Sequence, residues 1–434
     1  MNTKSVIPIG VLLIVDKLDL GGGARRIKVY ADMLDRSHYT PVVVFRTSVI
    51  HRDVDSVIGK DTPRLHSSDP KQIAQFAAKH AVKVAYCWYD GKFHQDLFDL
   101  LMQLKRNKIA VVANNVFSYV DTRMDSLCDV VVFQTKFMMY KFVRQLDKKP
   151  RQLKKYVVLP NPVHDVYSGQ FALNSQQLQT KRSSLGFSEK DVVFGRFGRN
   201  DIVKWGDSLT GAMLSHLHHP SVKFLIVGMP RSRRWLFAFL RFLDPTISQS
   251  IKILPPTSSD RELFELMQCT DVIAHSVKIG EGCSNAINEG MYWGKAVITN
   301  PTPHCDNGQV EQVAHEQFGL IVRGMSEWNS AIEKLAADER LRKQFGRHAN
   351  ENVLSQITAE KIVKKFEMIL DLALGGHISK TLISPDSVEY KKFVENYTEN
   401  ARLSGSVLPV SLLGKLGSFL LRGFAYLEFK FFNG

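Results

Sequence analysis

Short apolar runs alternate with amphipathic patterns in the N-terminal part of the chain. Apolar runs of about four to eight residues predict buried strands, and apolar positions repeated every three or four residues predict helices. The predicted strands are residues 11–15, 41–45, 82–86, 109–113, 130–133 and 156–159. The predicted helices include residues 25–34, 71–80 and 96–105. This alternation indicates a parallel, doubly wound sheet.

The same alternation begins again after a polar interval at residues 168–184. The second series of predicted strands is 192–197, 222–227, 251–254, 272–275, 296–298 and 320–322. The predicted helices of this part are 207–217, 261–268, 284–293 and 327–335. We therefore expect an α/β protein with two Rossmann-like domains, residues 1–167 and 185–376, each around its own parallel sheet and facing the other across a cleft.

The composition is that of a globular protein in a reducing compartment. Hydrophobic residues make up 44% and charged residues 23% of the 434 residues, which argues against a disordered chain. The five cysteines show no Cys-x-x-Cys spacing, so neither a disulfide framework nor a zinc site is expected. The apolar run 11–15 is too short for a secretory signal, and charges interrupt the apolar stretch 407–432, so we expect a cytoplasmic protein without a transmembrane span.

Part of the net charge of +14 is concentrated in two segments that also contain large apolar residues. These are residues 136–156, with one acid, Asp147, among many basic residues, and residues 231–241. Each segment could be a solvated basic face over a core-facing stripe, or a surface that lies on an anionic membrane. Together with the basic, apolar tail 404–434 they favour peripheral association with the inner face of a membrane. Nucleic acid is not an expected partner, because no recognisable nucleic-acid-binding motif accompanies the charge.

A glycine loop follows the first predicted strand. Gly21, Gly22 and Gly23 precede a predicted helix, and three glycines allow the backbone to approach a ligand closely. The alternative is a flexible turn between strand and helix. The loop is neither a Gly-x-Gly-x-x-Gly fingerprint nor a Walker motif, so neither dinucleotide binding nor P-loop chemistry is expected.

Two cations follow the first strand of the second domain. Arg199 and Lys204 are five residues apart in the loop after residues 192–197, and such a pair can converge on one anion. The guanidinium can bind two phosphate oxygens at once, and the ammonium acts as a point charge. Taken alone, the pair would more often be surface charge.

Two carboxylates flank a predicted helix start in the same domain. Glu281 precedes Ser284, which is a good N-cap for a helix from Asn285 onward, and Glu289 lies within that helix. The N–H groups and positive dipole at a helix start suit a phosphate. Carboxylates on both sides of it suit hydroxyl-rich groups, so this segment predicts a nucleotide-sugar site.

These motifs together resemble glycosyltransferase family 4, whose members are retaining enzymes with the two-Rossmann GT-B fold. The resemblance rests on Arg199 and Lys204, on Glu281 and Glu289 at Glu-x7-Glu spacing, and on the run 294–298. The glycine loop 21–25 and the segment 158–163 are also similar to family segments. Order and spacing agree over roughly residues 8–375.

The resemblance implies a role for each matching residue. Arg199 and Lys204 would hold the donor diphosphate and stabilise the leaving group, and Glu281 would bind hydroxyls of the transferred sugar, so these three are the expected catalytic residues. Glu289 would bind the ribose hydroxyls. The remaining donor-binding residues are Gly22 and Gly23, which would close the site, and Ser284 and Asn285, whose amides would join that of Cys283 at the distal phosphate. No metal and no cofactor are expected, since Asp53-Val54-Asp55 is interpreted as an exposed loop.

The sequence departs from the family pattern in the first domain and after one strand of the second. The family often has a histidine in the stretch corresponding to 111–117, where this chain has Asn114 and Asn115, which can hydrogen-bond a sugar but cannot act as a base. Trp88 and Tyr89 could stack on an acceptor or pack in the core. His275 stands where proline is common, and we expect it to be a loop histidine with satisfied hydrogen bonds.

The resemblance implies transfer of a sugar, with retention, from a nucleoside-diphosphate sugar to a glycan or lipid-linked glycan in the synthesis of cell-surface polysaccharide or glycoconjugates. A noncatalytic nucleotide-sugar-binding scaffold and another GT-B enzyme, such as an epimerase, remain as alternatives. Residues 385–402 form a predicted helix that would cross back to the first domain. The tail 404–434 would either pack on the protein or lie in a membrane interface.

Overall fold

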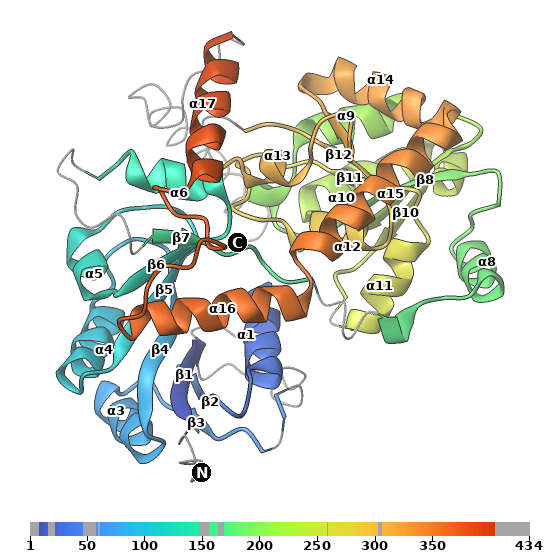
Figure 1. The fold of residues 1–434 in the computed structure, drawn as a ribbon. Coiled ribbons are helices and arrows are strands. Elements are labelled where there is room, and N and C mark those ends of the chain that lie inside the picture. The colour runs from blue at the N-terminus through green and yellow to red at the C-terminus, as the bar shows by residue number, and fades with distance from the viewer. Residues whose placement is uncertain are drawn as a thin grey trace, which may run out of the picture. The chain divides into compact units, whose positions relative to one another are not determined.

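The computed structural model describes residues 8–15, 22–46, 58–59, 61–146, 156–163, 169–257, 259–302 and 306–403. The chain forms two compact units. Unit 1 combines Met1–Pro162 with Ile357–Leu403, and the described part of unit 2 is Val163–Gln356. Each unit contains one all-parallel sheet with helices along the chain between its strands (Figure 1), so the predicted class, two Rossmann-like α/β domains, is confirmed.

The sheet of unit 1 has seven strands in the order β3-β2-β1-β4-β5-β6-β7. Its strands are β1 (Ile9–Val15), β2 (Tyr39–Phe45), β3 (Arg64–His66), β4 (Val82–Tyr89), β5 (Ala110–Asn115), β6 (Val130–Phe133) and β7 (Tyr156–Val158). All pairs of neighbouring strands are parallel. The apolar runs predicted every strand except β3, a short edge strand without a buried residue. Continuous apolar runs are expected in parallel strands because helices cover both faces.

The helices of unit 1 are α1 (Gly22–Met33), α3 (Pro70–Lys79), α4 (Gln95–Arg106), α5 (Thr122–Leu127) and α6 (Lys136–Val143). Local sequence explains where they begin. At α3 the Asp69 carboxylate accepts a 2.9 Å hydrogen bond from the Lys71 amide, and Pro70 occupies the first helical position, where no N–H is needed.

Helix α6 decides between the two alternatives that the sequence left open for the first basic segment. Its apolar side chains, among them Phe137, Met138 and Phe142, are buried in the core of unit 1, and even Lys141 is buried. Within residues 136–146 the core-facing alternative therefore holds. Residues 147–155 lie outside the described part of the chain.

Two further helices from the C-terminal region belong to unit 1. They are α16 (Ala359–Ala373) and α17 (Val388–Leu403). In α16, the ring of Phe366 stacks on Tyr30 of α1 at 3.9 Å, and Asp371 accepts a 2.6 Å hydrogen bond from the hydroxyl of Tyr39. The predicted end of the second domain at residue 376 is therefore too late, because α16 packs against α1, β5 and β6 of unit 1 (Figure 1).

The sheet of unit 2 has six strands in the order β10-β9-β8-β11-β12-β13. Its strands are β8 (Val192–Phe197), β9 (Val222–Val227), β10 (Ile251–Leu254), β11 (Val272–His275), β12 (Ala296–Thr299) and β13 (Gly319–Ile321). Chain order runs outward from β8 to β10 on one side and from β11 to β13 on the other. The strand order therefore reverses between β8 and β11, which pair in parallel through Val272 and Phe194.

The helices of unit 2 are α8 (Ser175–Ser184), α9 (Asp207–Ser215), α10 (Arg231–Leu243), α11 (Asp260–Gln268), α12 (Asn285–Tyr292), α13 (Gly308–Gln312), α14 (Gly324–Ala337) and α15 (Glu339–Gln356). The described part of unit 2 also contains the 3-10 helices η2 (Gly169–Phe171), η3 (Ile202–Lys204) and η4 (Pro245–Gln249). The polar interval 168–184 contains α8, whose start is a capping box between Asn174 and Gln177. Unit 2 accordingly begins at Val163, before the predicted residue 185.

No helix in the described ranges is both long and apolar enough to cross a membrane. The tail 404–434, for which packing and membrane binding were the alternatives, lies outside those ranges.

Candidate active site

The candidate site of unit 2 lies at the carboxyl ends of β8 and β11, where the strand order reverses. Ligands of doubly wound sheets bind beyond the carboxyl ends of the strands at this kind of position. Arg199 and Lys204 follow β8, whereas Glu281, Ser284 and Glu289 follow β11. Because the two strands are hydrogen-bonded neighbours, their loops start side by side.

Lys204 and Glu281 lie next to each other. Lys204 ends η3, and its Nζ is 3.6 Å from Oε1 of Glu281 and donates a 3.3 Å hydrogen bond to the carbonyl of Gly280. Gly280 has φ +70°, and a β-carbon there would overlap the carbonyl oxygen of Asp306. The bend that presents Glu281 to Lys204 therefore requires glycine.

His275 joins this pair, although the sequence predicted only a satisfied loop histidine. It is the last residue of β11, and its side chain is 2% exposed. Its Nε2 lies 3.2 Å from Oε2 of Glu281 and 3.1 Å from the hydroxyl of Ser284. The signal in the sequence was a histidine at a strand end, six residues before the predicted sugar-binding carboxylate.

The electrostatics of the cluster favour an ionised carboxylate and a neutral imidazole. Burial by itself would raise the pKa of Glu281, but Lys204, His275 and Arg196 outweigh it and hold that pKa well below its usual range. Burial lowers the pKa of His275, and Glu281 opposes this only in part. Because an ionised carboxylate can only accept, the imidazole proton that serves Glu281 belongs on Nε2.

Arg196 is a second residue that sequence reasoning missed. It lies within β8 and is 3% exposed, so that its apolar neighbours concealed it as part of a strand. Its guanidinium donates to the carbonyl of Phe197 and, at 2.7 Å, to that of Lys204, and it lies 5.7 Å from the ring centre of Trp205. Arg196 thereby fixes the backbone that carries Lys204, and its charge contributes to the low pKa of Glu281.

Two glutamines of α13 hold the loop that contains Glu281. The amide of Glu281 donates a 3.1 Å hydrogen bond to Gln309. The amide of Ser284 donates to Gln312 at 2.7 Å, and Gln312 returns a 2.9 Å bond to the Ser284 carbonyl. The Ser284 amide is therefore engaged with a side chain of the protein in this structure, and its role at the distal phosphate stays a prediction.

The predicted helix start is correct, but its cap differs. Ser284 is the residue before α12, yet its side chain makes no capping hydrogen bond, because its hydroxyl is directed to His275. A serine that does not cap its helix leaves the first turn to other partners. The hydroxyl of Ser284 thus serves the orientation of His275.

The remaining predicted donor residues have separate positions. Arg199 is exposed directly beyond β8, and Glu289 is 4% exposed within α12. Asn285 is the first residue of α12. Gly22 and Gly23 open α1 of unit 1, and their role at the donor site stays a prediction.

In unit 1, the two asparagines at the end of β5 are used differently. The side chain of Asn115 donates to the hydroxyl of Tyr89 and the carbonyl of Tyr119, and accepts from the amide of Ser118. Asn114 is fully buried, and neither of its amide atoms has a hydrogen-bond partner in the described part of the chain. Tyr89 is buried, so for this residue the core-packing alternative holds.

Candidate metal ligands do not gather in the part of the chain that the structure describes, where no group of three His, Cys, Asp or Glu side chains is placed to hold an ion. Asp53 and Asp55 lie outside those residues.

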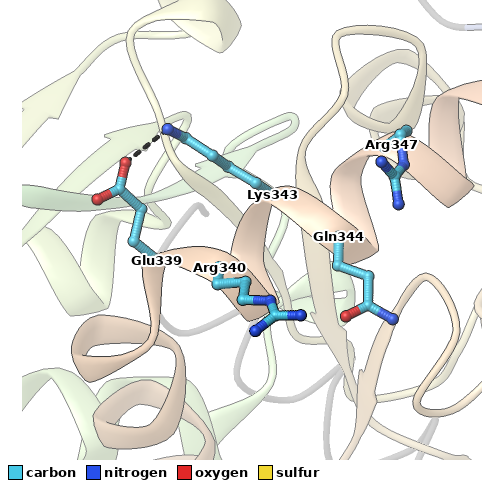
Figure 2. Close-up of a pocket in the computed structure, with 5 residues that line it drawn as sticks. All are labelled: Glu339, Arg340, Lys343, Gln344 and Arg347. Atoms are coloured by element: carbon cyan, nitrogen blue, oxygen red, sulfur yellow. Dashed lines mark ion pairs between the residues drawn. The ribbon is translucent and has the colours of Figure 1, made fainter.

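A hollow of about 910 Å³ lies on α15, away in sequence from the predicted donor residues. Figure 2 shows its lining, Glu339, Arg340, Lys343, Gln344 and Arg347, with Lys343 paired to Glu339 at 2.7 Å. All five side chains are exposed and come from one helix. None of the residues around Glu281 lines this hollow, so it does not enlarge the candidate site.

Residues 190–338 match the family described as Glycosyl transferases group 1. This segment contains Arg196, Lys204, His275 and Glu281, so the match covers the whole cluster described above. The match supports the interpretation of this protein as a glycosyltransferase. No curated protein sequence matches the chain significantly.

Solved structures with the GT-B fold are similar to most of the chain. HepE of Anabaena in complex with UDP has 15% identity and a TM-score of 0.67, covering 84% of this chain and 100% of that one. A glycosyltransferase of Rickettsia africae has 17% identity and a TM-score of 0.68, with 85% and 99% covered. Sucrose-phosphate synthase of Thermosynechococcus elongatus has 13% identity and a TM-score of 0.65, with 85% and 99% covered. At these identities the likeness shows the fold.

Proposed function

We propose that this protein is a retaining glycosyltransferase of the family 4 type, which transfers a sugar from a nucleoside-diphosphate sugar. The observation that carries the proposal is the cluster of Lys204, His275 and Glu281 at the strand-order reversal of unit 2, inside the segment that matches the glycosyltransferase family. The similar fold of HepE is found in complexes with UDP and with UDP-glucose. Uridine diphosphate sugars are therefore the first donors to test.

In the proposed reaction, the bond between the anomeric carbon and the diphosphate breaks, and its electron pair leaves with the phosphate oxygen. Arg199 and Lys204 stabilise the charge that develops on this leaving group, and Lys204, which is held partly buried beside Glu281, needs little reorganisation to do so. The acceptor hydroxyl forms the new bond on the same face of the sugar and gives its proton to the phosphate oxygen that has left. Neither a metal nor a cofactor takes part in this proposal.

Glu281 has a binding role in this scheme. Its ionised carboxylate, held by Lys204 and His275, accepts hydrogen bonds from hydroxyls of the transferred sugar. Glu289 binds the ribose hydroxyls, and Gly22 and Gly23 keep their proposed role as donor-binding residues. We assign a nucleophilic role to neither glutamate.

We further propose a glycan or lipid-linked glycan as acceptor, in the synthesis of cell-surface polysaccharide or glycoconjugates. The enzyme would act in the cytoplasm, associated peripherally with the inner face of the membrane. The net charge of +14 supports attraction to an anionic surface.

The donor assignment is tested by thermal shift with uridine, guanosine, adenosine and cytidine diphosphate sugars. We expect one donor class to stabilise the wild type, and Arg199→Ala and Glu289→Ala to lose most of that shift. Arg340→Ala, which removes an exposed arginine on α15, is the matched control and should respond like the wild type. The assignment fails if no nucleotide stabilises the protein or if all variants respond alike.

Product analysis then separates the alternatives. Transfer to an acceptor, with the anomeric configuration retained by NMR, supports the proposed enzyme. Donor binding without turnover would favour a noncatalytic scaffold, and conversion of the donor into its epimer would favour an epimerase.

A further inference from the structure

Helix α10 turns an apolar face outward from unit 2. Trp235, Phe239 and Phe242 are 66%, 59% and 82% exposed, and they follow one another at spacings of four and three residues. That spacing places the three rings on one side of the helix. Leu243 extends the exposed stripe by one further apolar side chain.

The opposite side of α10 is already packed. Phe237 is fully buried in the core of unit 2, and Leu240 packs partly against the same core. The helix is thus apolar on its inner and on its outer side. Helices of this kind are normally covered on both sides, whereas a single surface helix usually presents polar residues to water. We therefore expect a binding partner to cover the outer apolar stripe.

The exposed side of α10 is also positively charged. Arg231 and Arg234 are exposed near its first turn, and no described acidic side chain forms an ion pair with either. Arg233, by contrast, is paired with Asp207 at 2.6 Å. No acidic residue occurs from residue 231 to residue 243. The outer face therefore combines large apolar rings with unpaired positive charge.

This combination selects among the possible occupants. A second copy of α10 would bring arginines against arginines. The tail 404–434 is itself basic, because Lys415, Arg422 and Lys430 outnumber Glu428. An anionic bilayer offers lipid phosphates to the arginines and an apolar boundary to the rings, and tryptophan in particular favours the level of the headgroups.

We infer that α10 docks unit 2 on an anionic lipid bilayer, with Trp235, Phe239 and Phe242 inserted at the interface and Arg231 and Arg234 bound to lipid phosphates. The inference rests on the membrane association proposed above and not on the transfer reaction. It names the surface that makes the contact, which the similar basic pattern of α6 does not provide because α6 is buried.

The test is flotation of the full chain with vesicles of phosphatidylglycerol and phosphatidylcholine in equal amounts, and with phosphatidylcholine alone. We expect the wild type to bind the anionic vesicles, and Trp235→Ser/Phe239→Ser/Phe242→Ser to lose at least tenfold in binding. Val388→Ser, at a residue 82% exposed on α17, is the control for loss of an exposed apolar side chain and should bind like the wild type. An unchanged thermal shift with the donor nucleotide would show that the triple variant remains folded.

Two further measurements separate the contributions. Arg231→Gln/Arg234→Gln should reduce the preference for anionic over neutral vesicles and the sensitivity of binding to salt. Trp235 fluorescence should shift to the blue on anionic vesicles, and this shift should disappear in Trp235→Phe, which keeps a large apolar ring at the same place.

Each contrary outcome overturns a distinct statement. If the triple variant floats like the wild type, α10 is not the docking surface, although the membrane association stands. If the wild type floats with neither vesicle, the membrane association fails as well, while donor binding is judged separately by thermal shift. A wild-type dimer that the triple variant converts to a monomer would identify a second copy as the occupant. Loss of flotation only on removal of residues 404–434 would assign the contact to the tail.

Discussion

His275 Nε2 and Glu281 Oε2 lie 3.2 Å apart, so that a buried histidine at the end of β11 holds the carboxylate proposed to bind the transferred sugar. The other oxygen of Glu281 faces the ammonium of Lys204 at 3.6 Å. The carboxylate is therefore oriented by two side chains from different strand ends. Its geometry depends on the pairing of β8 with β11.

Replacement of His275 should separate sugar positioning from nucleotide binding. We expect His275→Ala to lower kcat about tenfold or more, because a hydrogen bond to a charged group contributes about 1.5–3 kcal/mol. Affinity for the free nucleoside diphosphate should change less than about twofold, since Arg199 and Glu289 are the residues proposed to bind it. Steady-state kinetics together with calorimetry of the nucleotide check both values. An equal loss of nucleotide affinity would show that His275 serves the whole loop and not the carboxylate alone.

Removal of the Lys204 charge should reduce the stabilisation of the transition state more than it reduces the affinity for the donor. We expect Lys204→Met to lower kcat about 10²-fold, the cost typical of losing one group that stabilises developing charge. The variant should also raise the pKa of Glu281, because Lys204 is the strongest of the groups that lower it. Lys343→Met, which removes a lysine paired with Glu339 on α15, is the matched control. Full activity of Lys204→Met would remove Lys204 from the catalytic set.

The low pKa of Glu281 predicts the direction in which the stability of the fold changes with pH. A carboxyl whose folded-state pKa is depressed stabilises the fold above its unfolded pKa, about 4.3 for Glu, and this contribution is lost as the pH falls toward the folded pKa. The melting temperature of the wild type should therefore decrease more steeply below about pH 4 than that of Glu281→Gln. Calorimetric scans from neutral to acidic pH measure this, and parallel curves would contradict it.

A pair of glycines separates backbone strain from steric overlap. Gly280→Ala forces both a positive φ and a collision with the carbonyl of Asp306, so we expect a loss of about 2–4 kcal/mol in the free energy of unfolding and weaker donor binding. Gly324 has a similar φ of +71° with nothing near its β-position. Gly324→Ala should cost only about 1–2 kcal/mol, with donor binding intact. Denaturant titration of both variants is the measurement, and equal losses would refute the steric argument.

The location of the candidate site could be predicted from sequence because its residues follow apolar strands. Lys204 and Glu281 stand after predicted strands, and the carboxyl ends of parallel strands meet at one edge of a sheet. The sequence also predicted the strands other than β3, since strands covered on both faces are apolar throughout. The edge strand β3 was not, because it buries no residue.

Hydrogen-bond partners at the site could not be predicted. The side chain of Gln312 accepts a hydrogen bond from the amide of Ser284, and the hydroxyl of Ser284 is hydrogen-bonded to His275. Neither partner is marked by spacing or residue type, because a side chain is directed by the backbone positions of several elements at once. The phosphate role of the Ser284 amide therefore stays a prediction.

The sequence by itself determined the two parallel sheets, the order of their strands along the chain and the residues that follow each strand, because apolar periodicity reflects local secondary structure. Only the tertiary structure decided which of two similar basic, apolar segments is covered. Residues 137–142 are buried within α6, whereas α10 exposes Trp235 and Phe242. It also decided that α16 belongs to unit 1. A periodic pattern states that a helix has an apolar side, but which surface covers that side depends on segments far away in the chain.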